Sequence, residues 1–167
     1  PYPGYGDYTD IFYSYNNPPN LLNMTFEKNE TFRGTLNNIT LRINDDRTSL
    51  ENMTIEVQER TDGDWYNISS GGTMIDKDEI MFDITTNYSS ELGYYSYRFR
   101  LTDQDDLTTG WIYYNNSVYV KNNLPEIEFL YHDPTNVGRG SDIIFGIRAF
   151  DLETPIEELN FSYGLVE

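Results

Sequence analysis

Apolar and polar residues alternate along most of the stretch between residues 18 and 123. Ile39, Leu41 and Ile43 occupy one phase of such an alternation, and polar residues occupy the other. A period of two is typical of half-buried β-strands, and no apolar set recurs at the spacing of a helix. Turn-forming residues interrupt the pattern about every eight to twelve residues, which favours several short strands.

The residues predicted to face inward belong to seven successive strands. They are Leu22, Met24, Phe26, Ile39, Leu41, Ile43, Met53, Ile55, Val57, Trp65, Ile80, Phe82, Ile84, Tyr95, Tyr97, Phe99, Leu101, Val118 and Val120. Seven short strands in about a hundred residues favour two sheets packed face to face, with the inward phase of every strand in one shared core. The sequence therefore predicts an all-β sandwich.

The chain also contains an internal repeat at a separation of 106 residues. Arg33-Gly34 recurs as Arg139-Gly140, because 139 − 33 = 106, and Asn16-Asn17 recurs as Asn122-Asn123 at the same separation. The match continues without a gap over residues 41–55 and keeps the phase of the apolar residues there. Self-similarity at a fixed separation predicts a structural unit that occurs in tandem.

The repeat divides the chain into parts of three copies. Residues 1–17 are predicted to close one copy, 18–123 to form a complete copy, and 124–167 to open a third. A copy as short as the third cannot close its own sandwich. Either the rest of it follows in a longer polypeptide, or an identical subunit supplies strands by complementation, with residues 1–17 as the natural donor. The first alternative is favoured, because the two partial copies together are shorter than one repeat.

Two motifs of the complete copy resemble a known family. Residues 91–97, Glu-Leu-Gly-Tyr-Tyr-Ser-Tyr, resemble the Asp-x-Gly-x-Tyr-x-Cys signature of the sixth immunoglobulin strand, with Tyr95 at the tyrosine-corner position and Tyr97 in place of the cysteine. Residues 97–111 and 118–125 are similar to the closing strands and junction of immunoglobulin-like repeats, of polycystic-kidney-disease or fibronectin III type, in archaeal and bacterial surface proteins. The resemblance implies tandem immunoglobulin-like β-sandwich repeats at the cell surface, in an S-layer, a filament or an adhesin.

Charge and cysteine content narrow the classes of function. The chain has 28 Asp and Glu against 11 Lys and Arg, a net charge of −17. A field of this sign repels phosphate backbones and anionic lipid headgroups, so nucleic acid and membrane surface are poor partners. No stretch reaches the roughly 20 apolar residues that cross a bilayer. Because there are no cysteines, disulfides, thiolate zinc sites and cysteine nucleophiles are excluded.

Eight sites of the form Asn-x-Ser/Thr predict N-glycosylation and an extracellular location. They begin at Asn23, Asn29, Asn38, Asn52, Asn67, Asn87, Asn115 and Asn160. With 17 asparagines and 26 serines and threonines among 167 residues, about three such sites are expected by chance. The alternative is that part of the excess reflects a polar composition.

The strand phases agree with glycans at these sites, because a glycosylated asparagine cannot point into a packed core. Four sites adjoin residues predicted to face inward, and so face outward; they are Asn23, Asn38, Asn52 and Asn160. Asn29, Asn87 and Asn115 fall in predicted turns. Glycans and acidic loops together would keep a long array hydrated and would discourage wrong pairing of strand edges.

Two predicted loops concentrate carboxylates at one end of the sandwich. The residues are Asp45, Asp46 and Glu51 in the first loop and Asp103, Asp105 and Asp106 in the second. The preceding copy enters at this end through Asn16-Asn17. A hard cation such as calcium, which takes six to eight oxygen ligands, could be shared by the loops and the linker. The alternative is that these acidic turns are only solvated; no other cofactor is predicted.

Catalysis is the weaker interpretation of this sequence. His132 is the only histidine and no serine motif accompanies it, so a serine triad or a histidine-rich metal centre cannot be assembled. The alternative to a structural role is a binding module for carbohydrate or for another surface protein, in which tyrosines act as stacking platforms. The candidate tyrosines are Tyr5, Tyr8, Tyr13, Tyr94, Tyr113 and Tyr114.

Overall fold

A computed structural model describes residues 15–68, 71–133, 136 and 138–162 of the chain. Its strands are β1 (Asn20–Phe26), β2 (Glu30–Phe32), β3 (Leu36–Asn44), β4 (Thr54–Arg60), β5 (Tyr66–Asn67), β6 (Thr73–Asp76), β7 (Glu79–Thr85), β8 (Gly93–Thr102), β9 (Ile112–Lys121), β10 (Glu126–Asp133) and β11 (Ile144–Phe150). Two three-residue 3₁₀ turns, η1 (Leu50–Asn52) and η2 (Ile156–Glu158), complete the regular structure of the described residues. The predicted all-β fold is confirmed.

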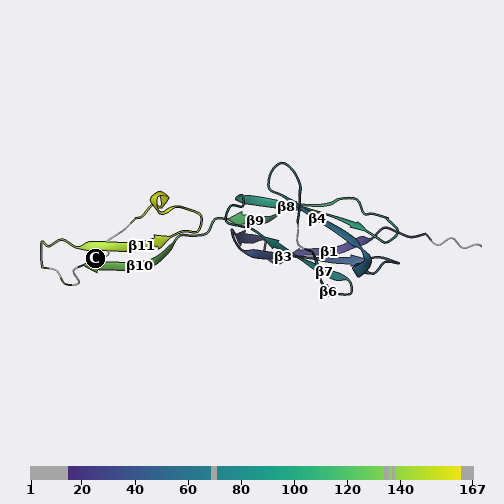
Figure 1. Cartoon of the computed structure of the whole chain (residues 1–167), viewed down its shortest axis with the longest axis horizontal. Helices are drawn as coiled ribbons and strands as arrows, with labels where there is room; N and C mark the ends of the chain where they lie inside the picture. Colours follow the sequence, from purple (N-terminus) through teal and green to yellow (C-terminus); the bar gives the residue numbers. More distant parts are fainter. Residues whose placement is uncertain (1–14, 69–70, 134–135, 137, 163–167) are drawn as a thin grey trace, which may run out of the picture.

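Strands β1 to β9 form two sheets (Figure 1). One sheet has the order β1-β3-β7-β6 and the other the order β2-β9-β8-β4-β5. Neighbouring strands run antiparallel, except that β2 runs parallel to β9. The inward residues of both sheets meet in one core. This arrangement is a β-sandwich, in agreement with the alternation of the sequence.

The core draws on the inward residues of β3, β4, β7, β8 and β9. Its buried apolar residues are Ile39, Leu41, Ile43, Leu50, Val57, Ile80, Phe82, Ile84, Tyr95, Tyr97, Phe99, Leu101, Val118 and Val120. Apart from Leu50, all of them belong to the inward set that the alternation predicts. Tyr97 is 1% exposed, and its ring centroid lies 5.2 Å from that of Phe26, so an aromatic pair bridges the two sheets here.

The prediction that Leu22 faces inward is wrong, because β1 contains a bulge. Leu22 is 52% exposed, and the register of β1 on β3 shifts between Leu21 and Asn23. One extra residue reverses the phase of a strand, so Leu21 packs against the core and Leu22 points away from it. Met24 and Phe26 follow the bulge and pack against the core as predicted.

A second irregularity alters the prediction for β9. Asn115 lies within this strand and not in a turn, and Tyr114, predicted on the outward phase or in a loop, packs against the core. The register of β9 on β8 shifts between Tyr95 and Tyr97, and Asn116 has a φ of 52°. A bulge with one left-handed residue lets the strand continue through an Asn-Asn sequence that is otherwise typical of a turn.

Strands β10 and β11 form a separate antiparallel hairpin, which projects from the end of the sandwich where β9 ends (Figure 1). Its register matches that of β1 on β3. Asn20 pairs with Asn44, and Glu126 pairs with Phe150, so both partners are displaced by 106 residues (126 − 20 and 150 − 44). Every other pair that continues β1 on β3 has its counterpart in the hairpin at the same displacement.

Local irregularities recur at this displacement as well. The register shift that follows Leu21 in β1 recurs after Ile127 in β10. Gly34 has a φ of 72°, and Gly140 has a φ of 86°, a left-handed conformation that glycine adopts at little cost. The turn η2 follows β11 as η1 follows β3. The hairpin therefore has the local geometry of the β1–β3 pair, including its bulge.

Leu41→Ala is expected to lower the free energy of unfolding by about 3 kcal/mol, because it opens a cavity at a side chain that has no exposed surface. Leu22→Ala is the matched control. It is expected to cost less than about 0.5 kcal/mol, since Leu22 lies on the outer side of the bulge. Urea denaturation followed by circular dichroism measures both values. An equal loss in the two variants would contradict the phase reversal at the bulge.

One carboxylate shares the inward phase of β4. Glu59 follows Val57 on this phase and pairs with Tyr97 of β8. Burial raises the pKa of Glu59 above its usual 4.5. The pKa of Tyr97 is raised as well, first by burial and then by the negative charge of Glu59. A carboxyl group whose pKa is higher in the folded chain stabilises the fold below its unfolded pKa, and this contribution is lost as the pH rises through the folded pKa.

Glu59→Gln is therefore expected to raise the Tm at pH 7 and to change it little near pH 3, which lies below the pKa of Glu59 in both the folded and the unfolded chain. Glu56→Gln is a control of opposite sign on the same strand, because a hydrogen bond from Arg100 lowers the pKa of Glu56. Thermal melts of both variants at the two pH values test the assignment. A fall in Tm for Glu59→Gln at pH 7 would refute it.

Candidate functional site

Two acidic loops hold the linker that enters the sandwich. Asn16 donates its Nδ2 group to Asp103 Oδ2 at 2.7 Å and to Asp105 Oδ2 at 2.9 Å. Asn17 donates its Nδ2 group to Asp46 Oδ2 at 2.9 Å. Hydrogen bonds to ionised carboxylates are stronger than bonds between neutral groups. The incoming chain is thus tied both to the loop after β3 and to the loop after β8.

Each of these loops is organised by its first aspartate. Asp45 Oδ1 accepts the backbone N–H of Thr48 at 2.6 Å, and Asp103 Oδ1 accepts that of Leu107 at 2.8 Å. Such turns let an aspartate side chain satisfy backbone donors of its own loop. The backbone N–H of Gln104 donates to Thr48 Oγ1 at 3.5 Å, so the two loops are in contact. Asp103 is buried, with Oδ2 directed at the linker.

Five of the six predicted calcium ligands lie in these two adjoining loops. They are Asp45, Asp46, Asp103, Asp105 and Asp106. Glu51 lies on η1, where its Oε1 accepts a hydrogen bond from Ser49 Oγ at 3.4 Å, and Asp106 is exposed at a φ of 64°. In the part of the chain that is described, no three Asp, Glu or His side chains are grouped so that they could hold a metal ion. Calcium binding stays a prediction.

The linker that leaves the sandwich is anchored in a similar way. Asn123 donates its Nδ2 group to the backbone oxygen of Arg33 at 3.0 Å and to the carboxylate of Glu153. Arg33 follows β2 and Glu153 follows β11, so one side chain joins the sandwich to the hairpin segment. Asn122 Oδ1 accepts a hydrogen bond from Arg33 Nη1 at 3.5 Å. Asn123 is the counterpart of Asn17, and both place an amide against an acidic loop.

The acidic loop of this second junction has the geometry of the first. Asp151 Oδ1 accepts the backbone N–H groups of Glu153 at 2.9 Å and Thr154 at 2.7 Å, as Asp45 Oδ1 accepts those two and three residues beyond it. The backbone donor of Glu153, aided by that of Thr154, lowers the pKa of Asp151. Sequence reasoning missed the anchoring bonds, because an Asn-Asn pair is typical of any turn. The sequence did carry one signal for them, because the Asn-Asn pair recurs at the same sequence separation from the aspartate that organises the acidic loop.

Seven of the eight predicted glycosylation sites are exposed. They are Asn23, Asn29, Asn52, Asn67, Asn87, Asn115 and Asn160. Asn38 is the exception, since its Nδ2 group donates to Glu27 Oε2 at 2.9 Å and its Oδ1 atom is buried. Asn160 lies beyond η2, outside any strand. The exposed side chains have the accessibility that an attached glycan needs.

Arginine and tryptophan side chains stack on the outer face of the five-stranded sheet. The Cζ atom of Arg98 lies 4.6 Å from the ring centroid of Trp65 and 4.1 Å from that of Trp111. Arg60 lies 4.5 Å over Trp65, and Arg100 lies 4.7 Å over Trp111. Such contacts contribute about 0.5–1 kcal/mol each at exposed sites. The prediction that Trp65 faces inward is wrong, because its ring lies on this outer face against two arginine side chains. Sequence reasoning did not find the Arg–Trp stack, because its members come from distant segments.

The tyrosines proposed as binding platforms are dispersed. Tyr94 and Tyr113 are exposed on the outer face, whereas Tyr114 packs against the core. Tyr94 lies edge to face with Tyr119 at 4.8 Å between ring centroids, and so does Tyr113 with Trp65 at 5.8 Å. The other three, Tyr5, Tyr8 and Tyr13, lie outside the described residues. The exposed rings thus pack mainly against other aromatic side chains of the same face.

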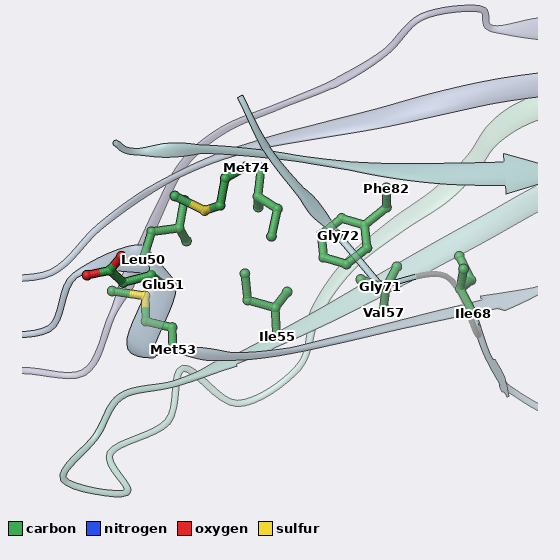
Figure 2. Close-up of a pocket in the computed structure, with 11 residues that line it drawn as sticks. Leu50, Glu51, Met53, Ile55, Val57, Ile68, Gly71, Gly72, Met74 and Phe82 are labelled. Atoms are coloured by element: carbon green, nitrogen blue, oxygen red, sulfur yellow. The ribbon is translucent and has the colours of Figure 1, made fainter. Parts of the chain in front are cut away.

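A cavity of about 380 Å³ opens between the two sheets (Figure 2). Ile55 and Val57 of β4 line one side of it, and Met74 of β6 and Phe82 of β7 line the other. Glu51 lies at one end, with its carboxylate pointing away from the apolar side chains (Figure 2). It is the one titratable residue in the described lining, so the described residues of the cavity offer no acid–base pair.

Comparison with known proteins gives only a distant likeness, and it is to a solved structure. No protein-family model matches the chain, and no curated protein matches its sequence. Among solved structures, the crystal structure of a Niemann-Pick type C2 protein from Japanese carpenter ant is similar, with 8% sequence identity and a TM-score of 0.44. The match covers 64% of this chain and 96% of that one. A likeness at this level does not bear on function. Within the described residues, no helix has the length and hydrophobicity to span a bilayer.

Asn123→Ala is expected to let the β10–β11 hairpin reorient relative to the sandwich, because it removes the side chain that contacts both. Nitrogen-15 relaxation should then give a shorter rotational correlation time for hairpin amides than for sandwich amides. Asn122→Ala is the control, since the Asn122 side chain contacts Arg33 within the sandwich. Both variants should lower the free energy of unfolding of the sandwich by less than about 1 kcal/mol. Unchanged relaxation in Asn123→Ala would rule out the anchoring role.

Proposed function

We propose that this chain is a structural segment of an extracellular, N-glycosylated surface protein or filament, built from immunoglobulin-like β-sandwich repeats in tandem. The observation that carries the proposal is the register of the β10–β11 hairpin, which matches that of β1 on β3 pair for pair. Two unrelated hairpins have no physical reason to share a bulge, a left-handed glycine and a 3₁₀ turn at one separation. Residues 18–123 then form one repeat, flanked by parts of two others at 1–17 and 124–167.

The sheet orders support the immunoglobulin-like class of sandwich. In that fold, strands A, B, E and D form one sheet, and strands C, F and G belong to the other. Here β1, β3, β7 and β6 take the places of A, B, E and D, and β4, β8 and β9 take those of C, F and G. The hydroxyl of Tyr95 donates to the backbone oxygen of Glu91 at 3.2 Å, which is the contact of a tyrosine corner. Tyr97 fills the place of the second cysteine with a buried ring.

The two junctions support a structural role over a catalytic one. Each linker carries an asparagine whose amide is bonded to an acidic loop, so successive units are held to one another by side-chain contacts as well as by the chain. His132 is exposed on β10 and packs against Phe145, with 6.2 Å between the ring centroids.

The distribution of charge and sequons supports an extracellular, cell-surface setting. The chain has a net charge of −17 and contains no cysteine. Seven of its sequon asparagines are exposed at the surface. Mutual repulsion and bound glycans would keep neighbouring arrays apart and hydrated. An S-layer, a pilus-like fibre and an adhesin stalk all require such units, joined to neighbouring repeats or to identical subunits. No contact with nucleic acid or membrane is proposed for this chain.

A second candidate is an adhesion module that binds another protein. The Arg–Trp stack formed by Arg60, Trp65, Arg98, Trp111 and Arg100 favours it, because tryptophan, tyrosine and arginine dominate binding hot spots. Carbohydrate is less favoured as the ligand. Stacking of a sugar needs a free ring face, and a guanidinium group lies over each tryptophan ring.

Peptide mass spectrometry of protein purified from the producing organism tests the principal proposal. We expect glycan mass on the exposed sequon asparagines and the lowest occupancy at Asn38, whose amide nitrogen bonds to Glu27. Asn44 is the internal control, since it is exposed but begins no sequon. An intact mass equal to that of the unmodified polypeptide would overturn the glycoprotein proposal.

A further inference from the structure

One face of the β10–β11 hairpin exposes apolar side chains whose counterparts in the sandwich are buried. Ile147 is 43% exposed and Phe145 is 58% exposed, whereas their counterparts Leu41 and Ile39 are both 0% exposed. The opposite face is mixed, since Arg148 pairs there with Glu128 at 2.9 Å beside the exposed side chains of Ile144 and Phe150. The face of the hairpin that carries Phe145 and Ile147, called its apolar face below, therefore corresponds to the buried face of β1–β3, but the described residues do not cover it.

The complete sandwich shows what covers the equivalent face. Along the edge of β3 opposite β1, strand β7 adds an antiparallel ladder, in which Leu41 pairs with Ile80 and Ile39 pairs with Phe82. The inward aromatic residues of β8, such as Phe99, share the core with these side chains. All strands that cover β3 in this way come after it in the chain. The turn η1 leads from β3 towards β4, and η2 stands at the equivalent place after β11.

We propose that the apolar face of the hairpin and the free edge of β11, which pairs with no other described strand, bind a closing half-repeat joined to the hairpin in the same polypeptide. This half-repeat carries a strand with the alternation of β7, which pairs antiparallel with β11 so that its apolar residues lie opposite Phe145 and Ile147. It also carries a second sheet, with the inward residues of β4, β8 and β9, which covers the apolar face. The inference rests on the repeat organisation proposed above and adds the occupant and its register.

The amide groups of β11 give a direct readout. In β3, the N–H of Ile43 donates towards the β7 side, to the backbone oxygen of Asp78 at 2.8 Å. Because amides alternate in direction along a strand, those of Ile39 and Leu41 point the same way. The matching register of the hairpin then directs the amides of Phe145 and Ile147 to the free edge of β11. These two amides should exchange rapidly with solvent until the partner strand binds.

The test extends the full chain with its own closing strands. Residue 167 corresponds to residue 61 at the repeat separation (167 − 106 = 61), so residues 62–123 are appended after Glu167. We expect hydrogen exchange at Phe145 and Ile147 to slow at least about a hundredfold relative to the 167-residue chain, towards the rates of Ile39 and Leu41 in the same molecule. Unchanged exchange at both amides would count against the proposal.

The hairpin and the appended residues 62–123 come from different predicted copies, so their side chains could fit together poorly. A second extended chain addresses this possibility. His132→Phe, Phe145→Ile and Ala149→Ile together restore the residues that stand at these places in the sandwich. If the amides of β11 stay unprotected in this chain too, the proposal is overturned. In an extended chain whose β11 amides are protected from exchange, Ile147→Asp should abolish that protection. Arg148→Ala, on the opposite face of the hairpin, should retain it, and equal loss in both variants would also overturn the proposal.

Sedimentation of the unextended chain distinguishes another occupant. If the 167-residue chain forms a dimer in which the β11 amides are already protected, the face is covered by a second copy, and the proposed source in the same polypeptide is wrong. A monomer with rapidly exchanging β11 amides agrees with the proposal. Absence of glycan would refute the surface-glycoprotein proposal without affecting these exchange rates, so the two failures can be told apart.

Discussion

Burial of the inward row of β3 is the interaction on which the other features of the sandwich depend. Ile39, Leu41 and Ile43 are at most 2% exposed, and they lie on the strand between β1 and β7. A row that is apolar on one phase needs a second sheet to cover it, and it tolerates only one register of its neighbours. The extra residue in β1 is accordingly accommodated as a bulge at Leu22, because a slip of the whole of β1 would turn its own inward residues away from the core.

The inward set was predictable to the extent that it depends on strict alternation. Residues of β3, β7 and β8 face the core as their phase predicts, since no residue is inserted within the predicted rows. Leu22 and Tyr114 could not be placed from sequence, because each adjoins a bulge whose position depends on the partner strand. Local propensity also misplaced Asn115, where pairing with β8 outweighs the preference of Asn-Asn for a turn.

The candidate site was predictable only in its location. The repeat and the acidic loops indicated that Asn16-Asn17 would meet Asp103 and Asp105, and the structure places these residues in contact. What the amides do there depends on rotamers and distances that no pattern encodes. With 28 acidic residues and 11 basic ones, most carboxylates cannot have a cationic partner. Asparagine amides act as neutral donors that satisfy some of them at the joints, without an ion pair.

The parallel pairing of β2 with β9 has a consequence for how the sandwich responds to tension. Glu30 pairs with Tyr119 and Phe32 with Lys121, so a strand near the start of the sandwich lies beside its last strand. The chain enters before β1 and leaves after β9, and a pull on these two ends slides β2 along β9 in shear. Bonds loaded in shear resist together, whereas bonds loaded at one end separate in succession. Two further backbone hydrogen bonds, from Tyr119 to Asn29 at 2.8 Å and from Arg33 to Lys121 at 3.0 Å, extend the β2–β9 pairing at both ends.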